Sequence, residues 1–126
     1  MLHFSTITIN KSEPIYIQIC RHIKRQIFQN SAVNGDALPS RRELAAKLGI
    51  NPNTIQKAYK HLEGEGILYT GSNTVSFLVV NEQTYAKISE EFKTEFIGSV
   101  IQEAKLCSFT FKQVVDMLSK QWEEDE

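Results

Sequence analysis

The 126-residue chain contains few of the residues that mark disulfide-rich, metal-binding or membrane proteins. It has two cysteines, Cys20 and Cys107, and three histidines, and none stands at the spacing of a metal site or a redox pair. No apolar run reaches the length of a membrane-spanning helix, and the N-terminus lacks the pattern of a secretory signal. Phosphate-binding glycine loops and nucleophile–base arrangements are also missing, so an enzyme has no supporting residues. We therefore expect reduced thiols, no metal or other cofactor, no membrane contact and a cytoplasmic location.

The net charge of the chain is only −1, but its charged residues are unevenly distributed. Residues 1–80 hold nine Lys and Arg against five Asp and Glu, whereas residues 81–126 hold five against ten. This distribution predicts that the front half meets a polyanion such as DNA. We interpret the acidic residues 123–126 as a solvated tail.

The middle of the chain predicts two short helices around a glycine turn. Ser40 is a strong N-cap residue, and Glu43 three positions later fits a capping box. Gly49 supplies the left-handed conformation that ends this helix. Asn51 then caps the next helix, and Pro52 fits its first position, where a missing N–H costs nothing. Two helices joined in this way are typical of a helix-turn-helix, which places its second helix in the major groove of DNA.

The second of these helices has one apolar face and one polar face. The apolar face holds Ile55, Ala58, Tyr59 and Leu62. The polar face holds Asn53, Gln56, Lys57 and Lys60. Amide side chains can bind adenine through two hydrogen bonds, and Thr54 can reach a phosphate or a thymine methyl. Arg41 and Arg42 begin the preceding helix, where one can reach guanine and the other phosphate.

The flanking segments predict a third helix and a β-hairpin. Pro14 opens a helix whose apolar face holds Tyr16, Ile19, Ile23 and Ile27. This helix also carries the basic residues Arg21, Lys24 and Arg25. Exposure to solvent and contact with phosphate are equally good explanations of these side chains. Further along, Ile67–Thr70 and Val75–Val80 predict two strands joined by Gly71–Thr74. A two-stranded hairpin is marginal alone, so it is expected to pack on the helices as the wing of a winged helix-turn-helix.

Three segments of the chain resemble the GntR family of bacterial repressors, and the YtrA subfamily in particular. They are Pro14–Ile19, Leu38–Ala45 and Asn51–Tyr59. The resemblance covers about residues 10 to 122 and implies a winged helix-turn-helix that binds operator DNA as a dimer. It also implies that the usual DNA contacts include Arg42, Asn51, Asn53, Thr54 and Gln56.

One departure from the family pattern concerns the tip of the wing. The family usually has basic residues followed by a Gly-x-Gly tip, whereas this chain has Gly71–Val75 with no basic residue. The phosphate contribution of the tip is therefore in doubt, although Asn73 can adopt the left-handed conformation that a tight tip needs. The complete set of predicted DNA contacts is Ser40, Arg41, Arg42, Asn51, Asn53, Thr54, Gln56, Lys57, Lys60, Ser72 and Asn73.

From about Asn81 the helical period returns and predicts two antiparallel helices with wide apolar faces. The first ends near Lys105, and Thr110 and Gln113 form a capping-box candidate for the second. Two helices cannot bury so many aromatic side chains against each other alone, so we expect the remainder to pack against a second subunit rather than only against the winged domain. The predicted dimer interface is Tyr85, Ile88, Phe92, Phe96, Val100, Phe111, Val115, Leu118 and Trp122.

The sequence thus predicts a mainly α protein with a winged helix-turn-helix at residues 10–80, a short two-helix dimerisation segment at 81–122 and an acidic tail at 123–126. The expected function is a sequence-specific repressor that binds a pseudo-palindromic operator as a homodimer. The resemblance extends this expectation to control of a transporter operon. Any small-molecule effector, whose identity the sequence does not reveal, would bind at the dimer interface or between the wing and the rear helices. The alternative is a winged-helix module that binds another protein; Arg41 and Arg42 together with the amides favour DNA.

Overall fold

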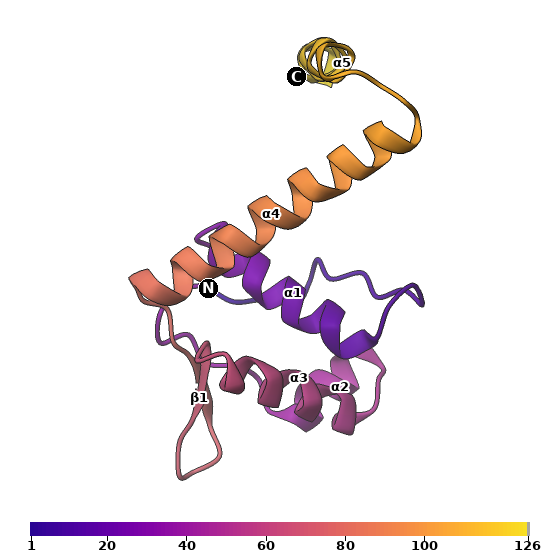
Figure 1. The fold of residues 1–126 in the computed structure, drawn as a ribbon. Coiled ribbons are helices and arrows are strands. Elements are labelled where there is room, and N and C mark those ends of the chain that lie inside the picture. The colour runs from indigo at the N-terminus through magenta and orange to yellow at the C-terminus, as the bar shows by residue number, and fades with distance from the viewer. Residues whose placement is uncertain (126) are drawn as a thin grey trace. The chain divides into compact units, whose positions relative to one another are not determined.

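The computed structural model describes residues 1–125, which form five helices and one antiparallel two-stranded sheet (Figure 1). The elements are α1 (Ile15–Phe28), α2 (Arg41–Leu48), α3 (Pro52–Gly64), β1 (Leu68–Thr70), β2 (Ser76–Leu78), α4 (Glu82–Leu106) and α5 (Phe111–Asp125). The chain divides into two compact units, Met1–Ser89 and the part from Glu90 onward. The mainly helical winged fold predicted from the sequence is confirmed.

The predicted caps form the helix-turn-helix. The Ser40 hydroxyl accepts a hydrogen bond from the Glu43 N–H at 3.1 Å, which is one half of the predicted capping box. Gly49 ends α2 with a φ of 68°, a conformation that other residues adopt only with strain. Asn51 caps α3 by accepting from the Asn53 N–H at 2.8 Å, and Pro52 follows it at the first helical position. These local signals fix where both helices begin and where the chain turns between them.

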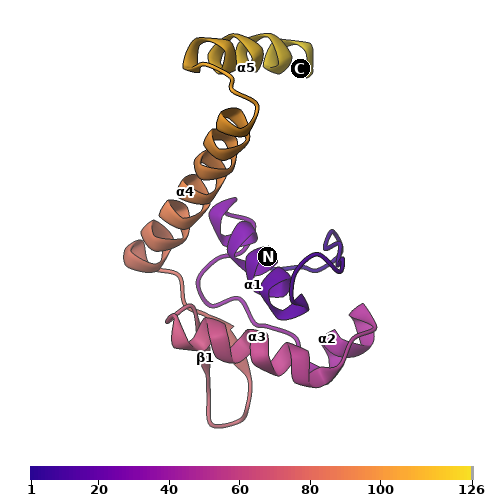
Figure 2. The same ribbon diagram turned by 45° about the vertical axis from the view of Figure 1, so that its right-hand side comes forward.

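The core of the first unit lies where α1 and α2 pack against α3 (Figure 2). Its largest fully buried side chains in the three helices are Ile19, Ile23, Ile27, Leu44, Ile55 and Leu62. Burying each such side chain contributes about 1.5–3 kcal/mol to folding. Because this apolar face of α3 is covered, its opposite face is the one that remains exposed.

The hairpin is shorter than predicted, but it has a third partner. β1 and β2 pair in the register Leu68↔Leu78, Tyr69↔Phe77 and Thr70↔Ser76. The segment before α2 runs along the other side of β2: the Leu38 N–H donates to the Ser76 carbonyl, and the Leu78 N–H donates to the Asp36 carbonyl, each at 2.9 Å. This pairing anchors a hairpin that would be marginal alone.

The N-terminal segment belongs to the first unit, whereas the sequence placed the start of the domain at residue 10. The ring of Phe4 is only 5% exposed and lies 5.4 Å from the ring of His22 on α1. Gln26 binds both backbone groups of His3, accepting from the N–H at 2.9 Å and donating to the carbonyl at 2.7 Å. The segment has no helical or strand periodicity, so the sequence pattern did not reveal this packing.

The first unit also includes the beginning of α4, which corrects part of the predicted dimer interface. Ile88 is fully buried within its own chain, so its assignment to a dimer interface is wrong. Tyr85 lies beside Phe28 of α1, with ring centres 6.2 Å apart, and its hydroxyl donates to the Phe28 carbonyl at 3.1 Å. The apolar period runs through α4 without a break, and periodicity alone cannot tell which partner covers each turn.

The second unit contains the rest of α4 and α5. The predicted capping box at the start of α5 is confirmed in both directions, with the Thr110 N–H donating to Gln113 at 2.9 Å and the Gln113 N–H donating to the Thr110 hydroxyl at 3.2 Å. The predicted antiparallel pairing is wrong, because α5 buries none of its residues and does not pack along α4. Large apolar side chains are exposed on both helices: Phe96, Ile97, Ile101, Leu106, Phe111, Val115, Met117, Leu118 and Trp122.

Candidate nucleic-acid interface

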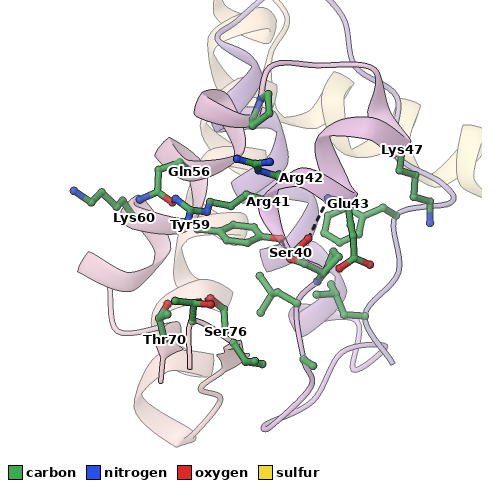
Figure 3. A pocket seen from close by; sticks show the side chains of 18 of the residues that line it. Ser40, Arg41, Arg42, Glu43, Lys47, Gln56, Tyr59, Lys60, Thr70 and Ser76 are labelled. Atoms are coloured by element: carbon green, nitrogen blue, oxygen red, sulfur yellow. Dashed lines mark hydrogen bonds between the residues drawn. The ribbon is translucent and has the colours of Figure 1, made fainter. Parts of the chain in front are cut away.

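A groove of about 1100 Å³ runs along α3 in the first unit (Figure 3). Its walls come from the N-terminal segment, the start of α2, α3 and the hairpin. The predicted DNA contacts that line it are Ser40, Arg41, Arg42, Asn53, Gln56 and Lys60. The predicted contacts that do not line it are Asn51, Thr54, Lys57, Ser72 and Asn73. The fold therefore brings the entry of α2 and one row of α3 to a single concave surface.

Basic side chains outnumber acidic ones in this groove. The basic residues are Arg41, Arg42, Lys47 and Lys60, and the acidic ones are Glu43 and Glu63. Arg42 and Lys60 are exposed, and neither has a hydrogen bond or ion pair within residues 1–125. Their cationic groups are thus available to an anionic ligand without breaking an existing pair.

Arg41 and Gln56 are joined across the two helices. The Arg41 guanidinium donates to the Gln56 side-chain oxygen at 2.5 Å. This bond fixes the orientation of the amide, whose oxygen keeps a second lone pair and whose nitrogen keeps two donors. Gln56 can therefore present a donor and an acceptor together, the combination that the major-groove edge of adenine requires.

Tyr59 forms part of the floor of the groove and supports the turn before α2. Its hydroxyl donates to the Pro39 carbonyl at 2.7 Å, and burial raises the pKa of Tyr59 above its ordinary value of 10.0. The phenol therefore stays protonated and keeps this bond. The bond holds the entry of α2 against α3, where Arg41 lies beside Gln56 (Figure 3).

Lys57 lies on the flank of α3 that does not line the groove. Its ammonium is 4.3 Å from the centre of the Tyr16 ring on α1, a cation–π contact. Thr54 and Asn51 lie near the start of α3, where Thr54 is half-buried and Asn51 acts as the cap. The polar face of α3 thus has two sides with different neighbours.

The tip of the hairpin differs from its prediction in one detail. The left-handed residue is Thr74, with a φ of 64°, and not Asn73. The Asn73 side chain instead accepts from the Val75 N–H at 3.3 Å, and the Gly71 N–H donates to the Val75 carbonyl at 3.0 Å. Ser72 and Asn73 are both exposed at this uncharged tip.

Several residues that line the groove were not predicted from the sequence. Lys47 at the end of α2 and Thr70 at the end of β1 both line the groove, and Thr70 shares a 2.9 Å hydroxyl–hydroxyl hydrogen bond with Ser76. Their polar character at the ends of the predicted elements was the available signal. His3 also lines the groove, and no sequence pattern connected it to α3.

The described residues hold no group of His, Cys, Asp and Glu arranged to bind a metal ion. Within the same range, no helix is both long and apolar enough to cross a membrane. Cys20 is buried and its thiol donates to the Ala58 carbonyl at 3.4 Å; burial raises the pKa of this thiol to about 11. A thiol in this environment is unreactive, so Cys20 acts as a core residue.

A helix-turn-helix with a paired hairpin, a basic groove and a polar outward face on its second helix defines a winged helix-turn-helix DNA-binding protein. The family described as bacterial regulatory proteins, gntR family, matches residues 15–74, and the chain belongs to this GntR family of transcriptional regulators.

The relatives agree with this assignment. The chain is 44% identical over 73 residues to the HTH-type transcriptional repressor YtrA of Bacillus subtilis, a match that covers 58% of this chain and 56% of YtrA. The solved structure of a GntR family transcriptional regulator from Listeria monocytogenes is 31% identical, with a TM-score of 0.80 over 89% of this chain and 98% of that one. AraR(DBD), solved in complex with operator ORR3, is 25% identical, with a TM-score of 0.50 over 63% of this chain and 95% of that one.

Proposed function

We propose that this chain represses transcription by binding a pseudo-palindromic operator as a homodimer, with α3 of each subunit in the major groove. The observation that carries the proposal is the groove itself, in which Arg42, Asn53, Gln56 and Lys60 converge from two helices. The operator complex of AraR(DBD) and the repressor YtrA support the same reading. We place this activity in the cytoplasm.

The residues of the groove divide into base contacts and phosphate contacts. Asn53 and Gln56 read bases through their amides, and Arg42 reaches a guanine. Lys60 and Arg41 neutralise backbone phosphates, which position the protein without selecting sequence. Asn51, Thr54 and Ser40 approach the backbone near the starts of the helices. The wing tip at Ser72 and Asn73 approaches it with uncharged groups.

The exposed apolar side chains of the second unit support the homodimer. Within residues 1–125, Phe96 is 64% exposed, Phe111 86% and Trp122 69%. Burying one such side chain contributes about 1.5–3 kcal/mol, so several per subunit sustain a stable pair. We propose an interface made of Phe92, Phe96, Val100, Phe111, Val115, Leu118 and Trp122.

A two-fold dimer explains why the operator should be an inverted repeat. Its two α3 helices would enter successive major grooves about 34 Å apart, one turn of DNA. An effector that binds at the dimer interface would regulate binding by changing this separation. Control of a transporter operon remains a prediction from the family resemblance.

The salt dependence of duplex binding tests DNA binding against the alternative of a protein-binding module. For each phosphate contact, the logarithm of the binding constant should fall with the logarithm of salt concentration at a slope near −0.9. With several basic residues per subunit at the groove, we expect a steep dependence. Failure of the chain to bind any duplex at low salt would contradict the proposal and favour the protein-binding module.

A further inference from the structure

The flank of α3 away from the groove holds a second cluster of polar groups, contributed by α1 and α3. Lys57 and His61 lie four residues apart on this flank, so their side chains are neighbours. Both contact Tyr16 of α1: the Lys57 ammonium lies 4.3 Å from the ring centre, and the His61 ring packs edge-on at 6.0 Å. None of the three residues lines the groove.

The charges around this cluster leave Lys57 as its available cation. Glu65 is the nearby acid: one of its carboxylate oxygens is paired with the Lys24 ammonium at 2.9 Å, and the other lies 3.1 Å from the His61 ring nitrogen. Lys57 has no ion pair within the described residues, and its only electrostatic neighbour there is the face of the Tyr16 ring. The aromatic face attracts the ammonium without neutralising its charge.

Tyr16 supplies a hydrogen-bond donor at the same place. Its side chain is half-buried, and within residues 1–125 its hydroxyl has no hydrogen-bond partner. By contrast, the buried tyrosine Tyr59 donates to a backbone carbonyl. Because the Lys57 ammonium sits over the Tyr16 ring, the two groups are close enough to bind the oxygens of one phosphate group.

The position of this cluster on α3 indicates which phosphate it would meet. A helix in the major groove has a phosphate strand on each side. The groove with Arg41, Arg42 and the hairpin faces one side of α3, whereas Tyr16 and Lys57 lie on the other. We propose that Tyr16 and Lys57 together form a binding site for one backbone phosphate on the strand away from the wing.

This inference rests on the proposed DNA-binding function and adds α1 to the DNA-contacting surface. The Tyr16 ring holds the Lys57 side chain in place, so less side-chain freedom is lost on binding. The site recognises a phosphodiester and no particular base, because neither group reads a base edge. Together with the contacts at the start of α2, it would hold α3 between the two strands.

The test uses the 126-residue chain and a random-sequence duplex pool, because a phosphate contact also contributes to binding without sequence preference. Tyr16→Phe keeps the ring and its contact with Lys57 but removes the hydroxyl; we expect binding to weaken about three- to tenfold. Lys57→Met should weaken it about tenfold and reduce the steepness of the salt dependence by about 0.9. The double variant should lose less than the product of the two single losses, since both groups bind one phosphate.

The controls are Tyr85→Phe, whose hydroxyl bonds to Phe28 of its own chain, and Lys87→Met, an exposed residue on α4. Neither should change the affinity or the salt dependence. Two outcomes would overturn this inference and leave the proposed function standing, provided that the wild-type chain binds the duplex pool. In the first, Tyr16→Phe binds with the affinity of the wild-type chain. In the second, the losses of the two single variants are fully independent in the double variant. Absence of duplex binding by the wild-type chain would instead overturn both.

Discussion

Arg42 and Lys60 line the same groove from different helices, and their cationic groups have different tasks in the proposed complex. Arg42 lies at the start of α2 with an exposed guanidinium that can form two parallel hydrogen bonds. Lys60 is a point charge on a flexible stem near the end of the outward face of α3. The first geometry can select a base, whereas the second can only attract a phosphate.

Replacement of these two residues should therefore have distinguishable effects. Arg42→Ala should weaken operator binding by about 1–3 kcal/mol and relax the base preference at one position. Lys60→Ala should weaken binding to all duplexes about equally. Anisotropy titrations with a panel of single-base operator variants measure both effects. If neither substitution changes duplex binding, the assignment of contacts is wrong.

His22 links the N-terminal segment to α1 and carries a pH dependence. Its ring nitrogen Nε2 lies 2.8 Å from the His3 carbonyl, to which it donates as a neutral imidazole, and Phe4 covers its ring. Burial lowers the pKa of His22 below its ordinary value of 6.5, and this effect exceeds the opposite effect of the hydrogen bond to the His3 carbonyl. The folded chain thus resists a proton that the unfolded chain binds near pH 6.5.

The free energy of unfolding should consequently fall as the pH drops below 6.5, and level off once the folded chain also protonates His22. Glu13 acts in a separate window: its hydrogen bond with Arg21 lowers its pKa from 4.5, so its contribution is lost only at lower pH. Denaturant titrations from pH 7 to about pH 5 measure the first window. His22→Gln retains an N–H donor and should flatten the curve there; an unchanged curve would contradict the role of His22.

At the scale of elements, each boundary that has a local signal was predictable from the sequence. The caps at Ser40 and Asn51 and the turn at Gly49 depend on residues within one helical turn, and all were found as expected. What the sequence did not predict depends on distant partners. The segment before α2 pairs with β2 across some 40 residues, and Phe4 docks on α1, neither of which leaves a periodic pattern.

Gly49 in the turn between α2 and α3 and Gly98 within α4 offer a matched pair of glycine substitutions. Gly49 has a φ of 68°, so Gly49→Ala should destabilise the chain by about 1–2 kcal/mol. Gly98 lies inside α4 with an ordinary helical conformation, so Gly98→Ala should stabilise that helix by about 0.5–1 kcal/mol. Thermal unfolding followed by circular dichroism compares the two. Equal effects of the same sign would show that the turn does not need its left-handed residue.

At the scale of the whole molecule, the candidate site was only partly predictable. The polar row of α3 follows from its 3.6-residue period, because an apolar face must be buried and leaves the other face outward. The division of that row between the groove and the Tyr16 flank depends on where α1 packs, which no local pattern encodes. For the same reason, the helical period predicted Ile88 at a partner subunit, although this side chain fills the core of its own chain.

The proposed dimer depends on the exposed apolar side chains of α4 and α5. Trp122→Ser and Phe111→Ser should each shift the chain toward monomer, because each removes a large apolar contact of about 1.5–3 kcal/mol. Val33→Ser is the control, since Val33 is 51% exposed in the first unit and lies outside the proposed interface. Sedimentation equilibrium measures the association. A wild-type chain that is monomeric at all concentrations would contradict the dimer.

Selection of bound fragments from random duplex DNA by the 126-residue chain tests the central claim most directly. If α3 of two subunits reads DNA, the recovered fragments should share an inverted repeat whose half-sites are centred about one helical turn, roughly 10 base pairs, apart. The Gln56→Ala chain should lose preference at one position in each half-site. Recovery of fragments with no common sequence would contradict the account.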